Sequence, residues 1–261
     1  NIVQLAGGVA LSEGRKAIGR ADVEWVLNCG QYNPRSQSRI RKEPMVGIVN
    51  GLAMYGPNLG TLIEVEAAAV PADRGRGQVR VTGVMEQEEF GRPGRTMRRR
   101  SQALSSADNV LTVLKACLGL RPQDYDIHIN FPGGIPVDGP SAGVSMVTAA
   151  ASALTNRPVA NLVAMTGEVT IHGMVKAVGG IVPKVRAAAE AGVKKVLIPR
   201  ENWQEILAAQ EGLEVVPVRC IQEVLEHALL TEAGEPRMTV ASRAASTLLG
   251  ASPKITPGII P

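Results

Sequence analysis

Ser141 lies in the segment Gly139-Pro140-Ser141-Ala142-Gly143, which matches the G-x-S-x-G pattern found around nucleophilic serines. A nucleophile elbow of this kind needs a strand that runs directly into the first glycine, and an acid followed by a histidine further along the chain. Here a loop rich in proline and glycine, residues 132–136, intervenes, and no Asp follows Asp138. A Ser-His-Asp triad is therefore poorly supported, although a hydrolase of small substrates that pairs Ser141 with His227 stays open as an alternative.

The position of Ser141 is more informative than the motif around it. An alanine-rich helix is expected to begin near Pro140 and to end at Thr155, because proline suits the first turn of a helix. Free backbone N–H groups and the positive end of the helix dipole face outward at such a turn, and they can stabilise an oxyanion. A serine that only caps the helix fits the same position.

A nucleophilic serine without a usable histidine needs another base, and lysine is the recurring alternative. Lysine acts as a base only when its amine is neutral, which requires burial or nearby positive charge. In a helix over residues 181–191, Lys184 shares one face with Ala187, Ala188 and Ala191. A lysine on that face can be buried. The alternative is that the side chain of Lys184 is solvated, as most helical lysines are.

The periodicity of the chain predicts a mixed α/β fold in which sheets and helices pack together. The first half reads as antiparallel, and residues 86–105, rich in arginine, are expected to form a solvated loop. The second half alternates helix and strand. The expected strands are 46–53, 61–67, 78–84, 126–131, 195–198 and 213–218. The expected helices are 106–118, 140–155, 181–191, 202–209 and 221–230.

Composition excludes several classes of protein. The 261 residues are 45% apolar and 20% charged, as in a folded soluble domain, and no apolar run is long enough to span a membrane. Three distant cysteines without a C-x-x-C pair argue against a disulfide framework or a structural zinc site. An assembly module that binds nucleic acid through the arginines of residues 86–105 is a third alternative. A net charge of +4 and 3% aromatic residues count against it.

Four linked segments resemble the proteolytic domain of Lon proteases, and the resemblance covers roughly residues 45–230. The segments are Asp138-Gly139-Pro140-Ser141-Ala142-Gly143, Ala164-Met165-Thr166-Gly167-Glu168-Val169-Thr170, Val178-Gly179-Gly180-Ile181-Val182-Pro183-Lys184 and Ala191-Gly192-Val193-Lys194-Lys195-Val196-Leu197-Ile198-Pro199. Val182-Pro183 before the lysine, Asn202-Trp203 and the arginine-rich residues 86–105 look most like the bacterial B-type branch.

The resemblance implies a serine endopeptidase with a Ser–Lys dyad, in which Ser141 is the nucleophile and Lys184 the general base. It also implies that Thr166 orients the lysine amine and that Asp138 belongs to the loop that shapes the pocket. Unfolded or damaged polypeptides would be the substrates, and a hexameric ring the assembly. No membrane or nucleic-acid partner is expected.

The resemblance and the composition together predict four regions. Residues 1–31 look like the last helices of the lid of an AAA+ ATPase, 32–44 a linker, 45–230 the protease domain and 231–261 a poorly ordered tail. No G-x-x-x-x-G-K-[ST] motif occurs, so ATP and magnesium would belong to an ATPase part outside this chain, and no cofactor is expected here. We expect the chain to be a piece of a longer cytoplasmic protein.

Overall fold

The structure is a computed structural model that describes residues 2–29, 40–56, 58–83, 87–92, 95–100, 102–133, 139–208, 210 and 212–231. For 87–92, 95–100 and 102–104 it describes the backbone alone. Asp138 and, apart from Thr231, the expected C-terminal tail lie outside these residues. Internal contacts divide the chain into two units, Asn1–Gln37 and Ser38–Pro261, and each is described by itself.

The first unit holds helices α1 (Ile2–Ser12) and α2 (Arg20–Cys29), whose residues Ala6 and Val26 are buried. The sequence suggests that Asp22 caps the second helix, but α2 begins two residues earlier. Asp22 is its third residue, and the carboxylate accepts a hydrogen bond from Gly19 N–H at 2.7 Å. It therefore closes the start of the helix from within, as an acid at this position of a capping box does.

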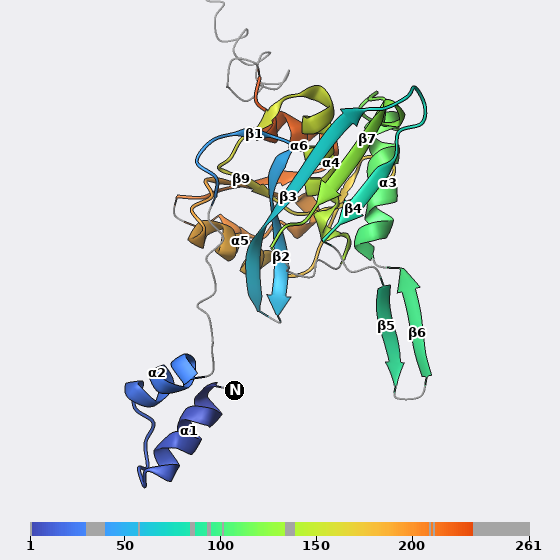
Figure 1. The fold of residues 1–261 in the computed structure, drawn as a ribbon. Coiled ribbons are helices and arrows are strands. Elements are labelled where there is room, and N and C mark those ends of the chain that lie inside the picture. The colour runs from blue at the N-terminus through green and yellow to red at the C-terminus, as the bar shows by residue number, and fades with distance from the viewer. Residues whose placement is uncertain are drawn as a thin grey trace, which may run out of the picture. The chain divides into compact units, whose positions relative to one another are not determined.

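A seven-stranded mixed sheet organises the second unit, in the order β13-β12-β9-β2-β3-β7-β4 (Figure 1). Strands β13, β12, β9 and β2 run parallel to one another, β3 is antiparallel to β2 and β7, and β4 is parallel to β7. The strands are β2 (Ile48–Gly56), β3 (Leu59–Pro71), β4 (Val79–Thr82), β7 (Tyr125–Asn130), β9 (Val163–Met165), β12 (Lys195–Pro199) and β13 (Glu214–Val218). The predicted α/β class is confirmed, with both halves of the chain sharing one sheet.

Helices cover the two faces of the sheet unequally. Helices α3 (Gln102–Ala116), α4 (Gly143–Thr155) and α6 (Ile221–Ala228) share one core with side chains such as Ile63 and Val65. Helix α5 (Ile181–Glu190) forms a second core with Leu52 and Leu62. Because side chains alternate along a strand, these two cores lie on opposite faces of β2 and β3.

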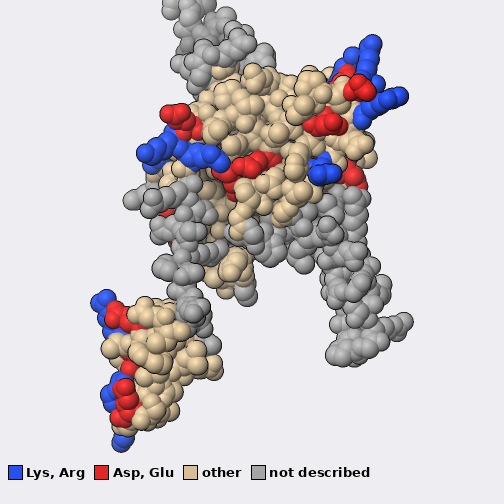
Figure 2. Space-filling view, viewed as in Figure 1, with Lys and Arg blue, Asp and Glu red and all other residues tan. Residues whose placement is uncertain are grey.

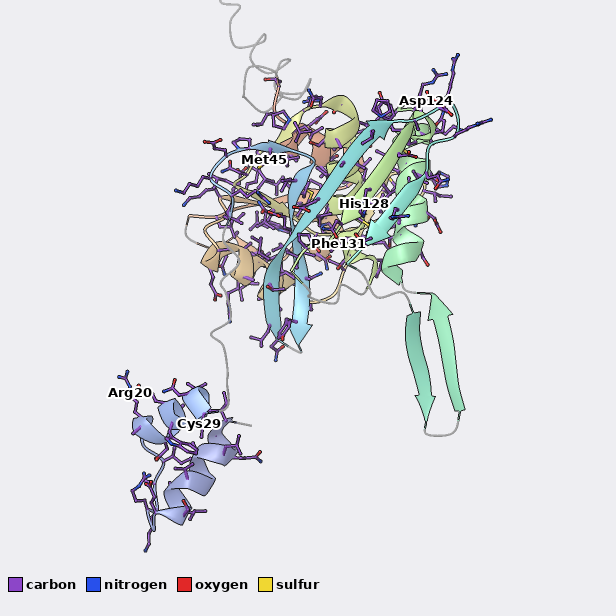
Figure 3. The ribbon with its side chains drawn as sticks, in the orientation of Figure 1. Arg20, Cys29, Met45, Asp124, His128 and Phe131 are labelled. Atoms are coloured by element: carbon purple, nitrogen blue, oxygen red, sulfur yellow. The ribbon has the colours of Figure 1, made fainter. Side chains whose placement is uncertain are left out.

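Helix α5 covers only part of its face of the sheet. The uncovered part, which we call the open half, carries the polar side chains of Glu66, Thr82, His128 and Asn130. Thr82 and Asn130 are hydrogen-bonded at 2.8 Å, and Asn130 donates to Glu66 at 3.3 Å. His128, labelled on β7 in Figure 3, is exposed and lies 2.9 Å from the Thr82 hydroxyl. On the side seen in Figure 2, acidic and basic side chains of the described residues are interspersed rather than gathered by sign.

Three two-stranded sheets and several short 3-10 turns complete the unit. Strand β1 (Met45–Val46) pairs with β8 (Pro158–Val159), and β10 (Glu168–Val169) pairs with β11 (Val175–Lys176). The 3-10 turns are η1 (Pro122–Asp124), η2 (Pro140–Ala142), η3 (Arg200–Asn202) and η4 (Glu205–Leu207). Among the described residues, the helices are too short or too polar to traverse a bilayer.

Two predictions of secondary structure are wrong. The expected loop over 86–105 contains the antiparallel pair β5 (Gln87–Arg92) and β6 (Arg95–Arg100) and the start of α3. The backbone ladder runs from Gln87 and Arg100 to Arg92 and Arg95, and it gives backbone N–H and carbonyl groups partners that a loop would leave to water.

The expected helix over 202–209 is replaced by the turns η3 and η4. In this stretch Leu207 is buried, but Ile206 is 60% exposed, so there is no buried apolar face to hold a helix.

Candidate active site

Ser141 lies at the centre of the turn η2, which leads directly into α4. Gly139 before it has φ of 104°, a conformation that side chains disfavour. The Ser141 carbonyl accepts a hydrogen bond from Gly167 N–H at 3.0 Å, and Val144 N–H donates to Gly167 at 3.1 Å. The serine turn is therefore joined to the end of β9 by its backbone.

Lys184 is the fourth residue of α5, and only 2% of it is exposed. The helix face expected from the sequence is the buried one, since Ala188 is fully buried. Close packing on β3 explains the burial, because a Cβ on Gly60 would lie 2.1 Å from the carbonyl oxygen of Pro183. Pro183 itself occupies the first turn of α5, where its missing N–H costs no helical hydrogen bond.

The Lys184 amine is buried without a compensating negative charge among the described residues. Its Nζ donates to Thr166 Oγ1 at 3.2 Å, and Thr166 is fully buried. Removal from water lowers the pKa of Lys184 to about 8, because burial penalises the charged form. A large fraction of this amine is therefore neutral in the mildly alkaline range, where an exposed lysine is charged.

Thr166 links the lysine to the serine turn. Its Oγ1 lies 3.4 Å from the Ser141 carbonyl oxygen and 3.5 Å from the Leu52 carbonyl oxygen. Its backbone N–H is held by Leu197 of the neighbouring strand β12 at 3.1 Å. One buried hydroxyl at the end of β9 thus contacts both the amine and the segment that carries Ser141.

Ser141 and Lys184 line the same cavity, whose volume is about 430 Å³. No direct hydrogen bond joins Ser141 Oγ to Lys184 Nζ in the described structure. Among the described residues of the lining, Lys184 has the one ionisable side chain, so the cavity suits an uncharged group. The other lining residues are Leu52, Ala53, Met54, Ile63, Gly139, Pro140, Ala142, Ala177, Val178, Gly179 and Gly180.

His227, the alternative partner of Ser141, lies elsewhere, and so does His172. His227 is half-buried on α6, where burial and Lys195 lower its pKa and Glu214 opposes them. His172 is exposed in the turn between β10 and β11. Neither histidine lines the cavity of Ser141, so the geometry does not favour a hydrolase that uses His227. The described residues contain no group of three or more His, Cys, Asp or Glu side chains that could hold a metal ion.

Sequence reasoning missed the residues that form the cavity walls. One wall is the end of β2, Leu52 to Met54, and the other is the segment 177–180. A usable signal was the Gly179-Gly180 pair directly before the lysine helix, since paired glycines permit a close approach of the backbone. Gly180 has φ of 68°, and a Cβ there would lie 2.4 Å from Met54 Sδ, so the two walls touch at this point.

Comparison with known proteins agrees with the motifs. The model of the Lon protease (S16) C-terminal proteolytic domain matches residues 17–231. Lon protease 2 of Bacillus subtilis is 48% identical over 237 residues, which cover 91% of this chain and 43% of that protein. Lon protease 1 of Thermus thermophilus is 40% identical over 222 residues, covering 82% of this chain and 25% of that protein.

An archaeal relative extends the similarity further. The Archaeal Lon protease of Thermococcus kodakarensis is 33% identical over 272 residues, covering 96% of this chain and 40% of that protein. The chain thus spans less than half the length of each of these three relatives. With the shared cavity of Ser141 and Lys184 and a family match over most of its length, this chain belongs to the family of Lon protease C-terminal proteolytic domains.

Proposed function

We propose that this chain is the peptidase part of an ATP-dependent Lon-type protease, a serine endopeptidase that uses Ser141 as nucleophile and Lys184 as general base. One observation carries the proposal. A buried lysine with a pKa of about 8 lines the same cavity as a serine at the start of a helix. Burial supplies the neutral amine that a lysine base requires.

The reaction begins with transfer of the Ser141 hydroxyl proton to the neutral Lys184 amine. This transfer needs the two groups within about 3 Å of each other, a distance often reached only when substrate binds. The serine oxygen attacks the scissile carbonyl, and backbone N–H groups of the serine turn η2, which precedes α4, stabilise the oxyanion. The Lys184 ammonium then protonates the leaving amine, and an ester joins the acyl group to Ser141.

Hydrolysis of the ester uses the same base. Lys184, neutral again, takes a proton from water, the hydroxide attacks the ester carbonyl, and the proton returns to Ser141 as the product leaves. Thr166 keeps the amine aimed at the cavity through its 3.2 Å contact. Asp138, outside the described residues, is proposed to shape the same pocket from the loop before Ser141.

Membership of the family supports a proposal about the setting of the reaction. We propose unfolded or damaged polypeptides as substrates, a cytoplasmic location and a hexameric ring that shields the cavity from bulk water. Because no G-x-x-x-x-G-K-[ST] motif is present, ATP and magnesium would be used by an ATPase part outside this chain. No nucleic acid or membrane partner is proposed.

Hydrolysis of an unstructured fluorogenic peptide without ATP tests the dyad. We expect the parent activity to rise as pH passes through about 8, since the base must be deprotonated. Ser141→Ala and Lys184→Ala should each lower kcat at least about 1000-fold. His227→Ala serves as the control and should leave kcat unchanged.

Covalent labelling of Ser141 provides a second measurement, which does not depend on rapid turnover of a peptide. Mass spectrometry after treatment with a serine-acylating reagent should show one modification at Ser141 in the parent and none in Lys184→Ala. Activity that persists in Lys184→Ala, or is lost in His227→Ala, would overturn the assignment of the base.

A further inference from the structure

We propose that Asn202 is a positioning residue that anchors the cavity wall 177–180 and thereby sets the affinity for extended peptides. The inference rests on the proposed function for the identity of the substrate. It starts from a contact that the reaction itself does not use. Asn202 ends the turn η3, directly after β12, and does not line the cavity.

The side-chain amide of Asn202 pairs with both backbone groups of one residue. Asn202 Oδ1 accepts a hydrogen bond from Val178 N–H at 2.8 Å, and its Nδ2 donates to the Val178 carbonyl at 3.1 Å. This is the pairing that a neighbouring strand would offer, supplied here by a side chain. Asparagine has both the donor and the acceptor that this contact requires.

The neighbouring contacts are weaker and more solvated. Glu201 pairs with Lys176 at 2.9 Å, and its other oxygen accepts from Ala177 N–H at 3.4 Å. Lys176 and Glu201 are each about half exposed, so water screens their attraction. Asn202 is therefore the principal anchor of this segment.

The anchor matters because two glycines come directly after Val178. Gly179 and Gly180, the most permissive residues for a backbone, separate Val178 from α5. Without a fixed point at Val178, this stretch would sample many conformations, and ordering it would cost binding energy. With Val178 held, the wall is formed before the substrate arrives.

Lys184 is held by other contacts. Its amine is fixed by Thr166, and the first turn of α5 is fixed by its close packing on Gly60. Loss of the Asn202 contact should therefore weaken the binding of peptide and leave the proton affinity of the base unchanged. This separates a positioning role from a general structural one.

The test compares Asn202→Ala and Asn202→Asp with Glu205→Gln, a matched change on the exposed residue that begins η4. Asn202→Asp keeps an acceptor for Val178 N–H but sets a second oxygen against the Val178 carbonyl. For an extended fluorogenic peptide we expect both Asn202 variants to raise KM about tenfold, with kcat within about threefold. Asn202→Ala loses both hydrogen bonds, and Asn202→Asp loses one and adds repulsion between two oxygens. Hydrolysis of a small activated ester and the pH midpoint of activity should match the control.

Amide hydrogen exchange gives a readout independent of turnover. Exchange in the segment 175–182 should accelerate at least about tenfold in Asn202→Ala, because the Val178 N–H loses its acceptor, while α4 should keep its protection. Unchanged exchange at 175–182, an unchanged KM, or a parallel loss of peptide and ester hydrolysis would overturn the proposal. Peptide hydrolysis that survives Ser141→Ala would overturn the proposed function instead, and the exchange result would still decide the anchor.

Discussion

Two basic side chains on the same face of the sheet show how burial decides the chemistry of a charge. Lys184 is in the half covered by α5, where a neutral hydroxyl is its partner and its pKa falls to about 8. Arg41 lies beside the open half, 42% exposed, and bonds Glu64 at 2.7 Å. That carboxylate raises the pKa of Arg41, and the guanidinium lowers the pKa of Glu64.

The contrast shows why the Lys184 amine suits the proposed role of a base better than the paired side chain of Arg41 does. A paired, partly solvated cation such as Arg41 is stable in its charged form. A buried cation without a counter-ion is held closer to its neutral form, at a cost in folding free energy. Burial of Lys184 therefore costs stability and lowers the pKa of its amine, and strongly shifted pKa values of this kind cluster at functional sites.

The largest expected effect on the free energy of unfolding comes from neutralising the buried amine of Lys184. In the unfolded chain the pKa of lysine is about 10.5, and in the folded chain that of Lys184 is about 8. Between these values the unfolded state binds more protons, so stability should rise with pH, by about 3 kcal/mol in total. Urea unfolding from about pH 7 to about pH 10.5 measures this rise.

Variants at Lys184 sharpen that measurement. In Lys184→Met the rise should vanish, and the variant should be the more stable at neutral pH because an apolar side chain replaces a buried amine. Lys184→Arg should be destabilised at every pH, since guanidinium stays charged. Lys115→Met, on an exposed position, is the control and should keep the parent's profile. A parent whose stability is flat across this range would show that Lys184 is not desolvated.

A smaller effect, on kcat, is expected from removing the Thr166 hydroxyl that contacts the Lys184 amine. Thr166→Val keeps the shape of the side chain but removes the acceptor for Lys184 Nζ. We expect kcat for a fluorogenic peptide to fall about 10- to 100-fold with KM unchanged, as loss of one buried hydrogen bond implies. Thr166→Ser should recover most of the loss, whereas a Val variant with full kcat would remove Thr166 from the orienting role.

The smallest effect on the free energy of unfolding is expected from breaking the ion pair of Arg41 and Glu64. Arg41→Met should change the free energy of unfolding by less than about 1 kcal/mol at neutral pH, and less still in high salt. Because the pKa of Glu64 is lowered in the folded state, the contribution of this pair is present above the unfolded pKa of the carboxyl. It is lost as pH falls through the folded value.

Peptidase activity provides the second measurement on Arg41→Met. The activity should stay within about twofold of the parent, since the pair lies outside the cavity. A loss greater than about tenfold would show that the two halves of the face are coupled.

Much of the secondary structure was predictable from local pattern. The alternation in β2 and β3 and the helical spacing in α5 and α6 depend on neighbours within a few residues, so the sequence carries them directly. The hairpin of β5 and β6 was not predicted, because its many arginines are typical of a solvated loop. The turns η3 and η4 were predicted to be a helix. In that last stretch the Asn202 side chain pairs with a backbone 24 residues earlier, which no local pattern reveals.

The sequence by itself determined that a serine stands at the start of a helix and that a lysine shares a face with alanines. Only the tertiary structure decided that this lysine is buried, because Gly60, Thr166 and Ser141 approach it from distant parts of the chain. The pKa of an amine depends on the solvent around it. Solvent is excluded by contacts between residues far apart in sequence, so the basicity of Lys184 is a property of the fold.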